Sequence, residues 1–408
     1  MPIDICMLLH KPADNDSRVI REAQALQENG YNVLILSISP LHTKDQLREV
    51  EGIPVKDVSV QATWLDNLLD RFILKGMTYL LSLLRFLPVK WLGLRTSRLW
   101  GKHYRVMLDT IKMTNAVVYH ANDYHTLALA FIAFDNPTVV YDVHDLEFDR
   151  VRDPMPAIAN RLIDQKHAFE RSIEQVFARR CADIIAVSEA SAEFLEKQWS
   201  IEDVKVIRNL VDPPYDKQPE ITYPAHSEYT VVHVGNLNLG RQLDVLVDAF
   251  QYLPDDVSLV LMGHGTEMDK LQQQADTLTL GKRFHIVPPV SPNFVAATAS
   301  QAHLSAVLNP GVALNREYTY PQKLFESIAA GLPVVTGQTQ SVKYLVERYE
   351  LGVLVDVYDP KSVADGIMQI LQPKVYQQYC QNVEKARAAL NWQNEKQRLI
   401  DVYQAILS

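Results

Sequence analysis

Apolar and polar positions alternate in blocks along the first third of the chain. Apolar runs suited to buried strands occur at residues 3–9, 31–38, 115–123 and 137–145. The first two flank "VIREAQALQENG", which has helical periodicity and ends in Gly30. Strands that alternate with helices in this way indicate βαβ units and a parallel sheet.

A second alternation follows, with apolar runs in "YTVVHVGNLN", "VSLVLMGHG", "FHIVPPV" and "GVLVDV". The two series are separated by residues 210–226, a polar stretch rich in proline that we interpret as a linker. We therefore predict an α/β protein with an N-terminal domain over residues 1–212 and a second domain over residues 213–389. The tail is predicted to be two helices broken near Asn391, the last of which, residues 390–408, packs back on the first domain.

Residues 60–112 interrupt the alternation. From residue 66 to residue 112 there are nine Lys or Arg against three Asp, on a chain whose net charge is −9. A basic amphipathic helix can lie on an anionic membrane surface. The alternative is that these helices pack on the sheet and leave their basic faces in solvent. The sequence leaves both interpretations open.

The composition excludes several classes of protein. With 408 residues, 47% of them hydrophobic, the chain can bury two cores. Its 40 basic and 49 acidic residues argue against a general nucleic-acid binder. Three widely spaced cysteines suit a reducing compartment, and the N-terminus turns polar after nine residues, which indicates a first strand rather than a signal peptide. No stretch of about eighteen residues is apolar throughout, so we predict a cytoplasmic protein without a transmembrane helix.

The stretch "YTYPQKLFESIAAGLPVV" predicts a short helix between a loop and a strand. Pro321 suits the first helical position, and Gly331 suits a left-handed helix end. The backbone N–H groups of the first turn favour an anion, and a lysine there adds a full positive charge. The predicted donors are Gln322, Lys323 and Leu324. The alternative is that Lys323 only pairs with Glu326 on the helix surface.

Histidine and aspartate side chains gather where two predicted strands end, at His120 and Asp123 and again at His144 and Asp145. Ligands of open parallel sheets bind at the carboxyl ends of strands, so all four are candidate site residues. The "DND" of residues 14–16 has the spacing of a metal-binding pair, but it precedes a helix, so we interpret it as a cap or a cleft lining. We predict no metal and no cofactor.

Seven segments in order resemble one family. They are "NDSRVIREAQALQENGYNVLIL", "YHANDYHTLALA", "VVYDVHDLEFD", "ADIIAVSEASAEFL", "VKVIRNLVD", "VGNLNLGRQLDVLVDAF" and "YPQKLFESIAAGLPVV". Together they resemble retaining glycosyltransferases of family 4, also called group 1, which have the GT-B fold. The resemblance covers nearly the whole chain except residues 40–110. It implies two Rossmann-like domains that face a cleft, with the acceptor on the first domain and a nucleotide-sugar on the second, and no metal at the diphosphate.

The resemblance also implies roles for individual residues. Glu326 is expected to accept hydrogen bonds from the ribose hydroxyls, and the helix start to hold the diphosphate. The expected donor-binding residues are Gly235, Asn236, Arg241, Gly263, His264, Gly265, Ile286, Val287, Pro288, Tyr320, Gln322, Lys323, Leu324 and Glu326. The expected acceptor-binding residues are Asp16, Ser17, Arg18, Arg21, His120, Asp123 and Asp145.

The catalytic candidates are His144, expected to orient the transferred sugar, and Glu317. Many relatives carry two glutamates eight positions apart, but the position eight before Glu326 is Tyr318, and Glu317 lies one place earlier. The family's basic residue after the first strand of the second domain is Asn236 here. This departure shifts phosphate binding onto Arg241 and Lys323.

These patterns predict transfer of a sugar, with retention of configuration, from a UDP-sugar to a hydroxyl acceptor such as a lipid-linked sugar or a polysaccharide. Leaving-group stabilisation by fixed donors and positive charge would need little acid–base chemistry. Contact with the inner face of a membrane would use residues 66–112. Two alternatives remain: a catalytically silent GT-B domain that binds nucleotide-sugar or glycan, and a nucleotide-sugar epimerase.

Overall fold

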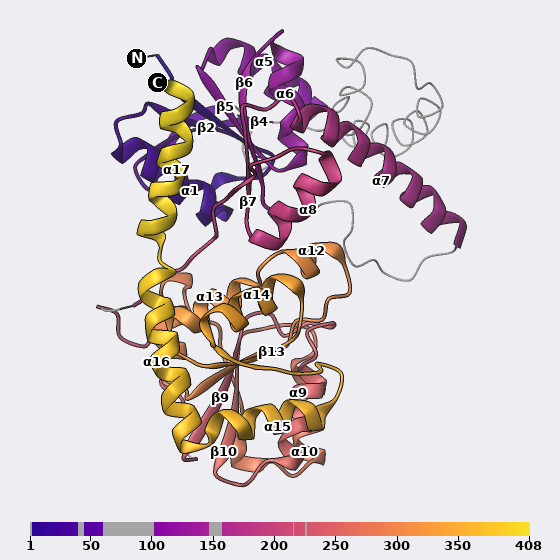
Figure 1. The fold of residues 1–408 in the computed structure, drawn as a ribbon, viewed down its shortest axis with the longest axis vertical. Coiled ribbons are helices and arrows are strands. Elements are labelled where there is room, and N and C mark those ends of the chain that lie inside the picture. Colours follow the sequence, from indigo (N-terminus) through magenta and orange to yellow (C-terminus); the bar gives the residue numbers. More distant parts are fainter. Residues whose placement is uncertain (1, 40–44, 60–101, 147–156, 215, 225–226) are drawn as a thin grey trace. The chain divides into compact units, whose positions relative to one another are not determined.

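The computed structural model describes residues 2–39, 45–59, 102–146, 157–214, 216–224 and 227–408. The chain forms two compact units. Unit 1 consists of Met1–Ile207 and Lys396–Ser408, and unit 2 of Arg208–Glu395. Each unit contains its own sheet and core, and Figure 1 colours both by position in the sequence.

Unit 1 is built on an eight-stranded sheet in the order β3-β4-β2-β1-β5-β6-β7-β8. All pairs are parallel except β3 with β4. The strand order reverses between β1 and β5, which is where a doubly wound sheet binds ligands beyond its carboxyl edge. The strands are β1 (Ile5–Leu9), β2 (Val33–Ser39), β3 (Gln46–Val50), β4 (Ile53–Ser59), β5 (Val118–Asn122), β6 (Thr138–Val143), β7 (Asp183–Ala186) and β8 (Lys205–Val206).

Helices cover the sheet of unit 1, and the last of them comes from the C-terminal segment of the chain. They are α1 (Ser17–Glu28), α5 (Lys102–Thr114), α6 (Tyr124–Ala133), α7 (Ala157–Ala178) and α8 (Glu189–Trp199), with the short η1 (Ala13–Asn15) before α1. The last helix, α17 (Trp392–Leu407), runs beside α1 in Figure 1, and Lys396 forms an ion pair with Glu28 there. Because Tyr403 of α17 is fully buried, the chain's end is part of the core of unit 1.

Unit 2 has a six-stranded, wholly parallel sheet in the order β11-β10-β9-β12-β13-β14. Its order reverses between β9 and β12, so the same rule places a ligand beyond the carboxyl ends of those strands. The strands are β9 (Tyr229–Val234), β10 (Val257–Met262), β11 (Phe284–Val287), β12 (Leu304–Val307), β13 (Val334–Thr336) and β14 (Gly352–Leu354).

Unit 2 contains both longer and shorter helices. The longer ones are α9 (Leu243–Ala249), α10 (Met268–Thr277), α13 (Gln322–Ala329), α14 (Gln340–Tyr349), α15 (Pro360–Leu371) and α16 (Pro373–Ala389). The shorter ones are α11 (Val295–Ala299), α12 (Leu314–Tyr318) and η4 (Phe250–Tyr252). The break predicted near Asn391 is confirmed, because α16 ends at Ala389 and α17 begins at Trp392.

Helix α13 ends as predicted but begins one residue later than predicted. Gly331 has φ +79°, its N–H donates to the Ile328 carbonyl, and the Leu332 N–H donates to the Ser327 carbonyl. These two bonds define a Schellman end. Pro321 is the N-cap, with ψ 130°, rather than the first helical residue, because its extended ψ keeps it outside the helix.

The candidate membrane-contact segment falls mainly on residues 66–101, which lie outside the described residues. Within the described part of the chain, every helix is too short or too polar to cross a bilayer.

Candidate functional site

Three turns of unit 2 are joined by backbone hydrogen bonds at the carboxyl ends of β9, β10 and β11. The N–H of Gly235 donates to the Met262 carbonyl at 2.9 Å, and the N–H of Gly263 donates to the Val287 carbonyl at 3.0 Å. A Cβ at Gly263 would lie 1.9 Å from the Gly235 carbonyl oxygen, so only glycine allows this approach. The predicted residues Gly235, Gly263 and Val287 therefore lie together in one backbone layer, which we call the floor of the candidate site.

A further close approach extends this floor. The Leu237 N–H donates to the His264 carbonyl at 2.8 Å, and a Cβ at Gly265 would lie 2.2 Å from the Leu237 carbonyl oxygen. The side chains of Asn236 and His264 are exposed at its rim, and Ile286 is half-buried in β11 next to Val287 and the exposed Pro288.

Positive side chains gather above the first of these turns. The Lys323 ammonium lies 3.1 Å from Nε2 of His233, and a Cβ at Gly235 would lie 2.8 Å from Cε of Lys323. Arg316 donates from Nη1 to the Gly240 carbonyl at 3.0 Å. Burial and the nearby charge of Arg241 lower the pKa of Lys323 to about 8, and Arg316 acts in the same direction. A lysine whose pKa is lowered by neighbouring positive charges indicates a site suited to an anion.

His233 supports the lysine from the strand below it. Its Nδ1 lies 2.9 Å from the Ala306 carbonyl oxygen, which can only accept, so this nitrogen carries the proton. Burial and the Lys323 charge lower the pKa of His233 well below its ordinary value. The neutral ring thus accepts a hydrogen bond from Lys323 through Nε2 and orients the ammonium.

Glu326 lies one turn along α13 from Lys323. Burial raises the pKa of its carboxyl to about 7, although the Lys323 charge opposes this effect. A carboxylate with few protein partners in such surroundings gains most from hydroxyl donors supplied by a ligand. Tyr320, also predicted, packs its ring against Phe325 of α13 at 5.2 Å between centroids.

The first turn of α13 offers fewer donors than predicted. The Leu324 N–H, also predicted as an anion donor, donates to the Pro321 carbonyl at 2.9 Å and is therefore already engaged within the protein. The physical reason is the extended Pro321, whose carbonyl closes a tight first turn. Gln322 and Lys323 remain as the backbone donors at this helix start.

Glu317 lines a second part of unit 2, a cavity of about 300 Å³ beyond β12 and β13. Its Oε1 accepts the backbone N–H of Gln340 at 3.1 Å, so the carboxylate caps α14. A Cβ at Gly311 would lie 2.2 Å from Oε2 of Glu317. The buried hydroxyl of Thr339 has no hydrogen-bond partner among the described residues and belongs to the same lining. The lining of this cavity therefore includes a carboxylate fixed by a hydrogen bond and a buried hydroxyl.

In unit 1, His144 is held by carboxylates on both sides of its ring. Its Nε2 lies 2.8 Å from Oδ2 of Asp142, and its Nδ1 lies 3.8 Å from Oδ2 of Asp123. Burial alone would lower the pKa of His144, but the charges of Asp142 and Asp123 outweigh it and raise the pKa to about 10. His144 is thus a fixed cation at neutral pH rather than a proton acceptor.

Asp123 reaches this position through a strained backbone. Its φ of 62° with ψ of 164° lies in a region that residues other than glycine rarely adopt. The strain aims Oδ1 at the backbone N–H of His144, at 3.1 Å, while the Asp123 N–H donates to the Asp142 carbonyl. Strain of this kind is typical of functional sites.

Arg18 is engaged entirely inside unit 1. Its Nη2 lies 3.0 Å from both oxygens of Asp142, its Nε lies 3.0 Å from Glu22, and its Nη1 donates to the Ile207 carbonyl. The Arg18 side chain is only 5% exposed. A direct contact between Arg18 and an acceptor would require this network to open.

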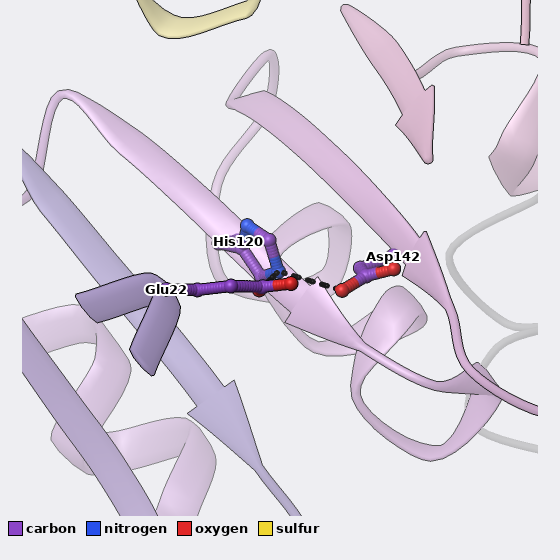
Figure 2. Close-up of side chains that lie close together, drawn as sticks. All are labelled: Glu22, His120 and Asp142. Carbon is purple, nitrogen blue, oxygen red and sulfur yellow. Dashed lines mark ion pairs between the residues drawn. The ribbon is translucent and has the colours of Figure 1, made fainter. Parts of the chain in front are cut away.

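Figure 2 shows Glu22, His120 and Asp142, whose ligand-type atoms lie within 4.8 Å of one another. Nε2 of His120 lies 3.7 Å from Glu22 and 3.6 Å from Asp142. Such a set suits a cation, but the guanidinium of Arg18 already bridges both carboxylates. A metal ion would have to displace that guanidinium, so we assign no metal here.

The other predicted acceptor residues surround this network. Asp16 caps α1 by accepting the Val19 N–H at 3.2 Å, as the capping interpretation predicted, and also pairs with Lys11 at 2.8 Å. Ser17 is exposed at the same helix start. Arg21 donates to the Ser17 carbonyl at 3.3 Å, and Asp145 is half-buried after β6.

Sequence reasoning missed several residues of the buried network around His144 in unit 1 and of the positive group beside the β9 turn in unit 2. Asp142 lies near the end of β6, two positions before His144, and Glu22 lies four positions after Arg18 on α1, so spacing could have found both. Arg316, His233 and Tyr403 have no local signal, because each meets its partner only after folding.

Each unit is a doubly wound α/β domain with polar residues at its switch point, and the second carries the cationic turn expected of a phosphate site. This is the architecture of a GT-B glycosyltransferase. A family model described as "Glycosyl transferases group 1" matches residues 215–388, and one described as "Glycosyltransferase Family 4" matches residues 17–214. The chain belongs to this family of glycosyltransferases.

Curated relatives match over part of the chain. One is the N-acetyl-alpha-D-glucosaminyl L-malate synthase of Bacillus anthracis, 23% identical over 50% of this chain and 53% of its own length. Another is the phosphatidyl-myo-inositol mannosyltransferase of Mycobacterium leprae, 25% identical over 54% and 59%. The chain spans about half the length of the curated relatives it matches.

Solved structures match over almost all of this chain. Sucrose-phosphate synthase from Thermosynechococcus elongatus has a TM-score of 0.68 with 16% identity and 99% coverage of both chains. Anabaena HepE in complex with UDP has a TM-score of 0.63 with 17% identity, covering 99% of this chain and 98% of that one. At these identities the likeness shows the fold.

Proposed function

We propose that the chain transfers a sugar from a uridine diphosphate sugar to a hydroxyl acceptor. The observation that carries the proposal is the positive charge beside the β9 turn, where the charge of Arg241 acts on both Lys323 and Arg316. Three positive side chains and the single carboxylate of Glu326 leave an excess of two positive charges. A nucleotide-sugar carries two negative charges on its diphosphate, so the two complement each other.

The same cations argue for a transfer that needs no metal at the diphosphate. Fixed positive groups and the helix start would stabilise the charge that develops on the leaving nucleoside diphosphate. Glu326 would accept hydrogen bonds from the ribose hydroxyls, and the floor of Gly235 and Gly263 would let the backbone approach the ligand.

The cavity beside Glu317 is the proposed site of the donor sugar, since it lies beyond β12, on the other side of the switch point from the turns. Its carboxylate and the Thr339 hydroxyl would meet sugar hydroxyls. His144, held as a cation in unit 1, would orient the transferred sugar without taking up a proton. Retention of configuration is typical of this family, so we propose it for this chain as well, by front-face displacement.

The proposed acceptor is a lipid-linked sugar or a polysaccharide, and the proposed location is the cytoplasm, with peripheral contact at the inner face of a membrane. Two relatives support the acceptor by their names: the M. leprae mannosyltransferase of phosphatidyl-myo-inositol, and a Campylobacter jejuni enzyme that acts on a diphospho-undecaprenol-linked sugar.

A binding panel tests the donor site. Calorimetric titration with UDP, GDP, ADP and their glucose conjugates should show selective binding of the uridine forms. Replacing Arg316→Ala should weaken that binding about 10- to 100-fold, the value of one or two charge-assisted hydrogen bonds. Lys361→Ala removes an exposed cation of the same unit and should leave binding unchanged. Equal affinities in all three proteins would contradict the proposed site.

Turnover tests the reaction itself. With a lipid-linked or polysaccharide acceptor, the wild type should release UDP and form a glycosidic bond with the donor's anomeric configuration, as read by NMR. Tight donor binding with no UDP release across a panel of acceptors would identify a silent binding domain instead.

A further inference from the structure

A buried chain of side chains joins the C-terminal helix to His144. The hydroxyl of Tyr403, on α17, lies 2.5 Å from Nδ1 of His120, on β5. Both residues are completely buried. The other ring nitrogen of His120 faces Oδ2 of Asp142 at 3.6 Å, and that same oxygen lies 2.8 Å from Nε2 of His144.

The proton positions follow from the groups that face each nitrogen. Nε2 of His120 faces carboxylate oxygens of Glu22 and Asp142 (Figure 2). Despite burial, the charges of Arg18 and His144 hold the pKa of Asp142 well below its ordinary value, so Asp142 is ionised and cannot donate, and Nε2 carries the proton. Nδ1 is then an acceptor, and the Tyr403 hydroxyl donates to it. Tyr403 keeps its proton, because burial and the charges of Glu22 and Asp142 raise the pKa of its phenol well above the ordinary value.

We propose that Tyr403 is a positioning residue for the candidate catalytic His144, acting through His120 and Asp142. The proposal rests on the transfer reaction proposed above. By donating to Nδ1, the Tyr403 hydroxyl directs the Nε2 proton of His120 toward Asp142, and Asp142 in turn holds the His144 ring. The end of the chain thus sets the geometry of a residue more than 250 positions earlier in the sequence.

Loss of the Tyr403 hydroxyl removes the group that donates to Nδ1 of His120. The His120 proton can then move to Nδ1, which leaves an unshared electron pair on Nε2 facing Asp142 and favours protonation of that carboxyl. With less negative charge on Asp142, the His144 cation becomes less stable.

Other charged groups also act on His144, and none of them is replaced in this experiment. The charged groups that face it come from α1 and its start, from β6 and from the turn after β5; they are Asp16, Arg18, Glu22, Asp142 and Asp123. Their presence in every variant isolates the effect of the tyrosine hydroxyl.

The test compares Tyr403→Phe with Tyr31→Phe in the full chain. Tyr31 packs against Tyr403 with ring centroids 6.4 Å apart. Tyr31→Phe therefore also removes a phenol hydroxyl beside α17. Histidine-selective ¹⁵N labelling would follow the His144 ring from pH 6 to 9.5, with the signal assigned from His144→Gln. In the wild type and in Tyr31→Phe the ring should stay charged to pH 9. In Tyr403→Phe its titration should move down by at least one pH unit.

Kinetics provide the second readout. In Tyr403→Phe, kcat should fall at least tenfold while KM for the nucleotide-sugar stays within twofold, because the nucleotide contacts lie in unit 2. An unchanged His144 titration would overturn the inference even if kcat fell, since a merely structural tyrosine would do that. If Tyr403→Phe does not fold, His120→Gln breaks the same link at its middle residue and is judged by the same titration. A wild type without turnover would refute the proposed function, while the titration would still decide the coupling.

Discussion

Replacing Arg18 with methionine tests the buried charge network of unit 1. Arg18 is 5% exposed, and the side chains of Glu22 and Asp142, with which it pairs, are completely buried. Methionine is similar in length and apolar, so it fills the space but removes the cation that pairs with both buried carboxylates. Removing one partner of a buried ion pair costs about 3–5 kcal/mol, because the remaining charge loses its compensation.

That cost should appear in thermal unfolding of unit 1. For a domain of this size, 1 kcal/mol corresponds to a shift of about 2–4 °C, so Arg18→Met should melt about 6–20 °C below the wild type. Differential scanning calorimetry would measure the shift, and hydrogen exchange of β6 peptides would assign it to unit 1. The difference should be larger at pH 8 than at pH 5, since the abandoned carboxylates take up protons more readily at low pH.

Two companion variants make the measurement decisive. Arg21→Met removes a neighbouring arginine of α1 whose Nε donates to the Ser17 carbonyl at 3.3 Å, and should shift melting by less than about 2 °C. Adding Glu22→Gln to Arg18→Met neutralises one abandoned carboxylate and should recover a substantial part of the loss. A melting point for Arg18→Met within 2 °C of the wild type at pH 8 would refute the reasoning.

The remaining predictions concern both units. Gly263→Ala forces a Cβ to 1.9 Å from a backbone oxygen and should reduce UDP affinity at least tenfold by calorimetry, whereas Gly30→Ala, with φ +90° but no atom within 4 Å, should cost only about 1 kcal/mol of stability and leave affinity intact. Affinity for UDP-glucose, whose phosphates do not titrate near neutrality, should rise as Glu326 ionises near pH 7 and fall as Lys323 loses its proton near pH 8; a flat profile from pH 6 to 9 would contradict both roles. The pKa of His144 is raised from 6.5 to about 10, so its contribution to stability is complete below pH 6.5 and is lost as pH rises through 10; chemical denaturation should show that His144→Gln loses this part of the alkaline decline.

Local patterns in the sequence predicted elements whose causes are local. The apolar runs of β1, β5, β6 and β9 are strands because parallel strands buried on both faces need continuous apolar sequence. The end of α13 followed from Gly331, since only glycine readily takes the left-handed conformation found there. The β3–β4 hairpin was missed, because its alternation is short and lies next to the basic segment.

The sequence by itself also placed His120, Asp123 and His144 at the carboxyl ends of predicted strands. It could not determine what those residues do. Only the tertiary structure enclosed Arg18 among carboxylates, engaged the Leu324 N–H in a tight turn, and placed Glu317 as the cap of α14. It alone brought Arg316 to the β9 turn and Tyr403 to His120. The physical reason is that the charge state and hydrogen bonds of a side chain depend on burial and on neighbours distant in sequence, and these exist only once the chain has folded.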